Sequence, residues 1–134
     1  MVIDASALVA CLLDEPERVR FIDAINADPV RLVSVVGFVE TSFVILGRKG
    51  EAGIADLQRF IADAQIERVP VDADQPDLAV EAFRRFGKGR HPAGLNIGDC
   101  FAYALAAATN EKLLYKGADF ARTDIVAAAR GGLP

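Results

Sequence analysis

Short apolar runs rich in β-branched residues alternate along this chain with longer segments in which apolar positions recur at helical spacing. The short runs predict strands and the longer segments predict helices with one buried face. The predicted strands cover residues 2–3, 30–34, 66–71 and 113–115, with residues 125–127 as a candidate last strand. The predicted helices cover residues 5–13, 16–27, 35–47, 50–63, 74–86 and 96–109.

This alternation predicts the fold class. Strands that alternate with helices form βαβ units, and their right-handed crossovers build a parallel sheet covered on both faces. We therefore expect a three-layer α/β/α domain with a mostly parallel central sheet of four to five short strands. A chain of 134 residues without internal repeats fits one domain spanning residues 1–134. The segment 87–95, with its three glycines and one proline, is expected to be a loop.

The composition narrows the class of protein further. A hydrophobic content of 52% excludes a disordered chain. Cys11 and Cys100 lie far apart without a CxxC pattern, which favours buried thiols in a reducing compartment over a disulfide. No secretory leader and no apolar run of the ~18 residues that a membrane span needs are present, so we expect a cytoplasmic protein. A net charge of −4 disfavours a surface that binds nucleic acid everywhere.

Three aspartates stand at strand ends or helix starts. Asp4 ends the first predicted strand, Asp99 opens the alanine-rich helix, and Asp119 follows the strand at residues 113–115. Each also has a structural interpretation, because Asp4 can cap a helix, Asp99 can favour a helix dipole and Asp119 can stabilise a turn. Ligands of parallel sheets bind outside the carboxyl ends of the strands, which is where these side chains are expected to meet.

Glu40 is harder to explain by local structure. It lies within the apolar helical segment VVGFVETSFVIL, and an unpaired buried carboxylate costs several kcal/mol or raises its pKa. The alternative is a polar stripe that Glu40 shares with Thr41 and Arg48. Clustered carboxylates repel one another unless a proton or cation intervenes, and hard oxygen ligands suit Mg²⁺ or Mn²⁺. Glu40 and the three aspartates thus form a candidate metal site.

Four stretches together resemble a known family. VIDASALVA, VETS, LNIGDCFAYALA and LLYKGADFARTDI occur in the order found in PIN-domain ribonucleases, specifically the VapC-type toxins of toxin/antitoxin modules. The resemblance covers nearly the whole chain. It implies a PIN-like fold and an endoribonuclease that uses Mg²⁺ or Mn²⁺ to cut single-stranded RNA, leaving 5′-phosphate and 3′-hydroxyl ends.

The resemblance also implies roles for individual residues. Asp4 and Asp99 would be the firmest metal ligands, and Glu40 a direct or water-mediated ligand. Many PIN domains carry the fourth acid where this chain has Gly117, so Asp119 takes that role or Asp124 helps; we favour Asp119. Around the metal ligands we expect supporting residues, with Ser6 bonded to Asp4 or to the phosphate. The expected supporting residues are Ser6, Thr123 and Asp124.

A cluster of basic residues is the remaining candidate for contact with RNA. Cations gather in FRRFGKGRHPAG without an acid between them, either as a solvated helix end or as a phosphate-binding lip. The candidate RNA-binding residues are Arg84, Arg85, Lys88, Arg90 and Lys116. His91, the only histidine, is expected on a surface loop rather than in catalysis.

The resemblance implies two protein partners and leaves two rival functions. A cognate VapB-type antitoxin would cover the acidic groove and insert a basic side chain, and the chain would form a homodimer. One rival is a PIN-like binding domain that has lost catalysis. The other is a receiver-type signalling domain, which also binds Mg²⁺ in an acidic pocket but would need two adjacent acids near the first strand.

Overall fold

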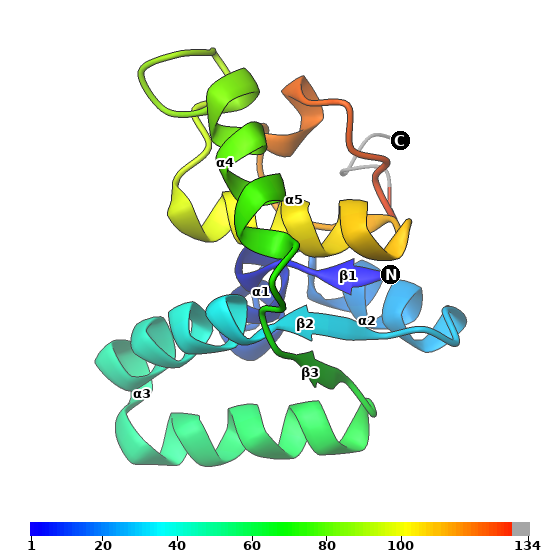
Figure 1. The fold of residues 1–134 in the computed structure, drawn as a ribbon. Coiled ribbons are helices and arrows are strands. Elements are labelled where there is room, and N and C mark those ends of the chain that lie inside the picture. The colour runs from blue at the N-terminus through cyan, green and yellow to red at the C-terminus, as the bar shows by residue number, and fades with distance from the viewer. Residues whose placement is uncertain (130–134) are drawn as a thin grey trace.

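A parallel sheet forms the centre of the computed structural model, which describes residues 1–129. Its four strands lie in the order β3-β2-β1-β4 (Figure 1). The strands are β1 (Val2–Ile3), β2 (Leu32–Ser34), β3 (Glu67–Val69) and β4 (Leu113–Leu114). The helices are α1 (Ala5–Leu12), α2 (Arg18–Ala27), α3 (Val35–Asp63), α4 (Gln75–Phe86), α5 (Ile97–Thr109) and a 3₁₀ helix at Phe120–Arg122. The predicted α/β class is confirmed.

The strand order places a crevice beside β1. The chain runs from β1 to β2 and β3 on one side, then returns through α4 and α5 to β4 on the other side. Val2 pairs with Leu32 of β2 and with Leu113 of β4, in parallel register on both sides. In open α/β sheets the point where strand order reverses is where ligands bind, outside the carboxyl ends of the strands. Here that point lies between β1 and β4.

Two apolar clusters, one on each face of the sheet, make up the core. Phe21, Ile25 and Leu57 belong to the cluster under α1, α2 and the second half of α3, whereas Leu105 belongs to the cluster under α4 and α5. Burial of these side chains is the main favourable term that holds the helices on the sheet. The two free cysteines are both buried, one in each cluster, as the sequence predicts.

Several predicted boundaries differ from the structure. The helices expected at 35–47 and 50–63 are both present within α3, and the chain bends between them at Gly50, whose positive φ of 63° glycine adopts without a steric penalty. The helix expected from residue 16 begins at Arg18, after a turn. Residues 125–127 do not form a strand: Ala127 makes a single parallel bridge to Leu113. None of the helices within residues 1–129 combines the length and hydropathy needed to cross a membrane.

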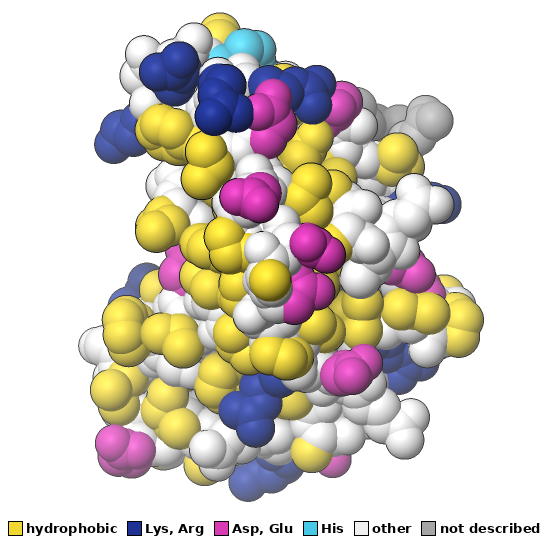
Figure 2. Space-filling view, in the orientation of Figure 1, with side chains coloured by type: hydrophobic (Ala, Val, Ile, Leu, Met, Phe, Trp, Pro, Cys, Tyr) yellow, Lys and Arg dark blue, Asp and Glu magenta, His cyan; other side chains and the backbone are white. Residues whose placement is uncertain are grey.

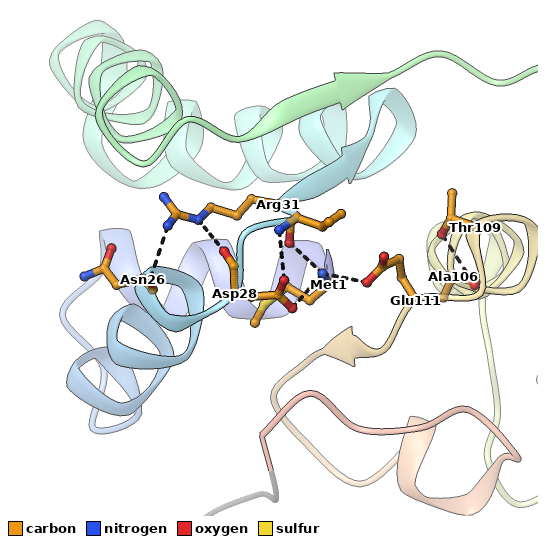
Figure 3. Close-up of polar contacts among 8 residues, drawn as sticks. Met1, Asn26, Asp28, Arg31, Ala106, Thr109 and Glu111 are labelled. Carbon is orange, nitrogen blue, oxygen red and sulfur yellow. Dashed lines mark hydrogen bonds and ion pairs between the residues drawn. The ribbon is translucent and has the colours of Figure 1, made fainter.

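The α-ammonium group of Met1 fixes the start of β1 (Figure 3). It donates to the Asp28 carboxylate at 2.9 Å, to the Val30 carbonyl at 2.6 Å and to the Glu111 carboxylate at 3.0 Å. Burial raises the pKa of Asp28, but the hydrogen bonds from the ammonium and from Val30 outweigh it and lower that pKa. These contacts tie β1 to the segments that lead into β2 and β4.

Candidate active site

Asp4 occupies the carboxyl end of β1 and caps α1. Its Oδ2 accepts hydrogen bonds from the Ser6 backbone N–H at 3.0 Å and the Ser6 hydroxyl at 2.6 Å. Only 4% of the residue is exposed. Burial raises the pKa of Asp4 to about 6, with the bonds from Ser6 opposing the shift and the charge of Asp99 adding to it. Asp4 is therefore both a helix cap and a buried acid of unusual basicity.

Ser6 links the ends of β1 and β4. Its Oγ accepts a hydrogen bond from the Lys116 backbone N–H at 2.9 Å while donating its proton to Asp4. A hydroxyl carries one proton, so the contact with Lys116 leaves that proton for the carboxylate. The predicted hydrogen bond between Ser6 and Asp4 is present, and it orients Asp4 within the crevice.

Asp99 lies in the first turn of α5, held by a capping box. The Asn96 side chain accepts from the Asp99 N–H at 2.9 Å, and Asp99 Oδ2 accepts from the Asn96 N–H at 3.0 Å. This reciprocal pair fixes the start of the helix and leaves Oδ1 of Asp99 without a capping role. Burial raises the pKa of Asp99, against the Asn96 bond, and the charge of Asp119 raises it further.

Glu40 projects from the second turn of α3 and is half-buried. Burial first, then the charges of Asp4 and Asp99, raise its pKa to about 7. The polar-stripe alternative does not account for it. The Thr41 hydroxyl donates to the Gly37 carbonyl of its own helix at 2.7 Å, and Arg48 lies two turns, about 12 Å, further along the axis.

Asp4, Glu40, Asp99 and Asp119 come from four separate segments: the end of β1, the second turn of α3, the first turn of α5 and the residue before the 3₁₀ helix. Their charges act on one another, as the raised pKa values of the first three show. Among residues 1–129, no three acidic, histidine or cysteine side chains are grouped so that they could hold a metal ion as they stand. The four are all carboxylates, the hard oxygen donors that Mg²⁺ and Mn²⁺ prefer, so their chemistry fits such a cation.

Asp124 does not join the acids. Its carboxylate accepts from the Tyr103 hydroxyl at 2.6 Å and from Arg85 at 3.0 Å, and the bond from Tyr103, followed by that from Arg85, lowers its pKa. Thr123 stabilises the adjacent turn, where its hydroxyl donates to the Phe120 carbonyl at 2.7 Å. Asp119 stays the favoured fourth acid, and supporting roles of Thr123 and Asp124 around a metal ion stay predictions.

Most of the predicted RNA-binding cations have protein partners. Arg84 pairs with Glu81, and Arg85 pairs with Asp124. Arg90 donates to the Arg84 carbonyl at 3.3 Å. Lysine and arginine side chains nevertheless gather at one end of the molecule, over the loop after α4 (Figure 2). Within the part of the chain that the structure describes, the backbone N–H of Lys88 donates to the Leu95 carbonyl at 2.9 Å, and its ammonium group makes no hydrogen bond or ion pair.

Lys116 and His91 have structural roles. The Lys116 ammonium lies 3.2 Å from a Glu15 carboxylate oxygen and 3.3 Å from one of Glu17. Those bonds raise the pKa of Lys116 and hold its charge on the α1–α2 connection. His91 lies on the loop as predicted, where its Nδ1 accepts from the Ala93 N–H at 3.0 Å.

The sequence reasoning missed Tyr103 and the two glutamates that bind Lys116. Tyr103 lies one helical turn beyond Asp99 on α5, so its spacing from a candidate ligand is a signal that could have found it. Glu15 and Glu17 lie about a hundred residues from Lys116, and no local pattern predicts that pairing.

Comparisons with known proteins identify the family and the fold. A family model described as the PIN domain matches residues 1–126. Ribonuclease VapC30 of Mycobacterium tuberculosis is 51% identical over 129 residues, which cover 96% of this chain and 98% of that protein. Ribonuclease VapC of Mycolicibacterium smegmatis is 51% identical over 127 residues, which cover 95% of this chain and 98% of that protein.

Solved structures show the same fold at low sequence identity. Mycobacterium tuberculosis VapC20, a sarcin-ricin loop cleaving toxin, matches with a TM-score of 0.76 and 16% identity, covering 93% of this chain and 95% of that one. VapBC2 from Rickettsia felis, bound to a DNA fragment from its promoter, matches with a TM-score of 0.74 and 13% identity, covering 94% of each chain. With the match over residues 1–126 and the 51% identity to VapC ribonucleases, the chain belongs to the PIN-domain family.

Proposed function

We propose that this protein is a VapC-type toxin, an endoribonuclease that hydrolyses RNA phosphodiester bonds with a divalent metal ion. The mutual influence of four carboxylates supports this proposal: the charges of Asp4 and Asp99 raise the pKa of Glu40, and that of Asp119 raises the pKa of Asp99, each in addition to burial. The ammonium group of Lys116 is bound to Glu15 and Glu17, so its charge does not neutralise the four carboxylates. The 51% identity to VapC ribonucleases supports the reaction class.

The carboxylates would hold Mg²⁺ or Mn²⁺, with Asp4 and Asp99 as the principal ligands. An ion bound there supplies an activated water and neutralises charge on the phosphate. Ser6 keeps Asp4 oriented, and the capping box keeps Asp99 on a rigid first turn. Glu40, whose pKa burial raises to about 7 in the metal-free protein, would be a direct or water-mediated ligand or would orient the attacking water. Asp119 is exposed and would be the fourth acid of the site.

The surface around the acids supports the expected protein partners. Exposed apolar side chains lie on the same helices as two of the acids: Phe43, three residues after Glu40 on α3, is 71% exposed, and Ile97, two residues before Asp99 on α5, is 75% exposed. A cavity of about 450 Å³ between α4 and α5 is lined by apolar residues that include Val80 and Phe83. A VapB-type antitoxin that places a basic side chain among the acids and apolar ones beside it fits this surface. A homodimer and a cytoplasmic location complete the proposal.

The receiver-type rival does not fit the topology. Receiver domains use the flavodoxin-like strand order 2-1-3-4-5, whereas this sheet has the order β3-β2-β1-β4. The inactive PIN-like domain remains the rival that an activity assay decides.

The proposal is tested with purified protein freed of antitoxin, incubated with single-stranded and structured RNAs in Mg²⁺, Mn²⁺ or EDTA. We expect cleavage that requires the metal and falls at least about a hundredfold in Asp4→Asn and Asp99→Asn. Asp23→Asn, which removes an exposed acid on α2, should leave the rate unchanged. Cleavage in EDTA, or full activity of both site variants, would contradict the mechanism. An antitoxin-free protein that binds these RNAs without cutting any of them favours the inactive domain.

A further inference from the structure

We propose that Gly98 is a positioning residue of the active site: its missing side chain lets the Glu40 carboxylate rest against the first turn of α5, beside Asp99. The inference rests on the proposed function, since it concerns how one of the proposed ligands is placed. It explains why glycine stands at position 98, the second residue of α5.

The close approach of the two residues is the main observation. Gly98 is buried, and a Cβ built on it would lie 2.7 Å from Oε2 of Glu40 and closer still to its Cδ and Oε1. Real Cβ atoms essentially never come within 3.0 Å of another heavy atom in this way. Any side chain at position 98 therefore displaces the Glu40 carboxylate.

The backbone gives no reason for glycine at this position. Gly98 is the second residue of α5 and is absent from the positive-φ glycines, which are Gly50, Gly89, Gly94 and Gly117. Glycine costs up to about 1 kcal/mol relative to alanine within a helix. The backbone does not require glycine at position 98, so we look for the reason in what Gly98 contacts. That contact is the carboxylate of Glu40, from α3.

A substitution of Gly98 should disturb the position of Glu40 and leave the fold unchanged. The displaced atoms are the far end of a flexible glutamate side chain, which can rotate away at little cost. The carboxylate would then leave the space that it shares with Asp4 and Asp99, whose charges it feels in the native arrangement. Gly98→Ala should thus weaken metal binding while keeping or slightly raising helix stability.

Gly47→Ala is the matched control. Gly47 lies on α3, the same helix as Glu40, and a Cβ there would meet nothing within 4 Å. It makes the same glycine-to-alanine change in a helix without touching the carboxylate. A loss seen in Gly98→Ala and absent from Gly47→Ala is therefore specific to the contact with Glu40.

The test is a double-mutant cycle measured by calorimetric titration with Mn²⁺. Gly98→Ala should weaken Mn²⁺ binding about tenfold in the wild-type background, and less than about twofold when Glu40 is already shortened to Asp. A general distortion of α5 would cost the same in both backgrounds, and that result would overturn the inference. Equal Mn²⁺ affinity of Gly98→Ala and wild type would overturn it as well.

A metal-free measurement separates this inference from the proposed function. In the absence of any divalent ion, the ¹³C resonance of the Glu40 carboxyl should shift in Gly98→Ala and stay in place in Gly47→Ala. If wild type fails to bind Mn²⁺, the metal site of the proposed function is wrong. The carboxyl resonance still decides the inference then, because an unmoved signal in Gly98→Ala refutes the positioning role and a moved one supports it.

Discussion

Substitution of Asp4 by asparagine should stabilise the metal-free protein near neutral pH. Asp4 is 4% exposed, and burial raises its pKa from 3.8 to about 6. In the folded state the group therefore keeps its proton at pH values where the unfolded chain has lost it. Ionisation of Asp4 in the folded protein therefore costs more free energy than its ionisation in the unfolded chain.

The sign and size of the effect follow from linkage. A raised carboxyl pKa contributes stability that is present below pH 3.8 and is lost as the pH rises through about 6. A shift of about two units corresponds to roughly 3 kcal/mol, since each unit is 1.36 kcal/mol. Asparagine is neutral at every pH and its side-chain oxygen can still accept from Ser6. It should recover most of that roughly 3 kcal/mol at pH 7.5 and little at pH 4.

The assay is urea unfolding in EDTA at several pH values between 4 and 7.5. We expect the free energy of unfolding of wild type to fall across this range, and that of Asp4→Asn to fall less. Asp23→Asn, on the exposed face of α2, controls for a general change of charge. Addition of Mn²⁺ should reverse the order, because the ion stabilises only a folded site that binds it. A difference between wild type and Asp4→Asn that does not change with pH would refute the reasoning.

Three further predictions follow from contacts around the crevice. Ser6→Ala should weaken Mn²⁺ binding about tenfold in calorimetric titrations, because Asp4 loses the hydroxyl that orients it; unchanged affinity would contradict this. Asp124→Asn should lower the free energy of unfolding in urea by about 1 kcal/mol and leave RNA cleavage intact, since Asp124 binds Tyr103 outside the acid cluster; lost cleavage in a folded variant would return Asp124 to the metal site. Replacing Lys88 and Arg90 by alanine should weaken RNA binding and reduce its salt dependence in filter-binding assays; an unchanged salt slope would exclude that loop from the RNA surface.

The parts of the site that the sequence predicted are those encoded by local pattern. Asp4 directly follows the β-branched residues Val2 and Ile3, and Asp99 lies three residues after Asn96, which is suited to cap a helix. Both positions could therefore be predicted from their neighbours in the chain. The prediction that strand ends meet is general to parallel sheets. In the structure β1 and β4 are adjacent parallel strands, so their carboxyl ends lie at the same edge of the sheet.

The parts that the sequence left open depend on tertiary contacts. Asp124 accepts hydrogen bonds from Tyr103 and Arg85, which lie on two other helices, and the choice between Asp119 and Asp124 as the fourth acid stays a prediction. Lys116 looked available for phosphate, yet its ammonium is bound by glutamates far away in the chain. These contacts join residues far apart in the chain and depend on how the helices pack on the sheet, so the spacing of residues in the sequence does not predict them.

Helix boundaries show the same division. The periodicity of residues 35–47 and 50–63 predicted two helices, and both are present as the two halves of α3. The pattern did not show that the bend lies at Gly50, which was predicted as the first residue of the second helix. The expected strand at residues 125–127 failed because only one residue pairs with β4.

The most direct test of the central claim is the anomalous diffraction of Mn²⁺ in crystals of the antitoxin-free protein. The account predicts an anomalous peak within coordination distance of the Asp4 and Asp99 carboxylates, and its loss in Asp99→Asn crystals grown in the same way. No peak at those carboxylates in saturating Mn²⁺, or a peak that persists unchanged in Asp99→Asn, would contradict the claim that these acids form a metal site.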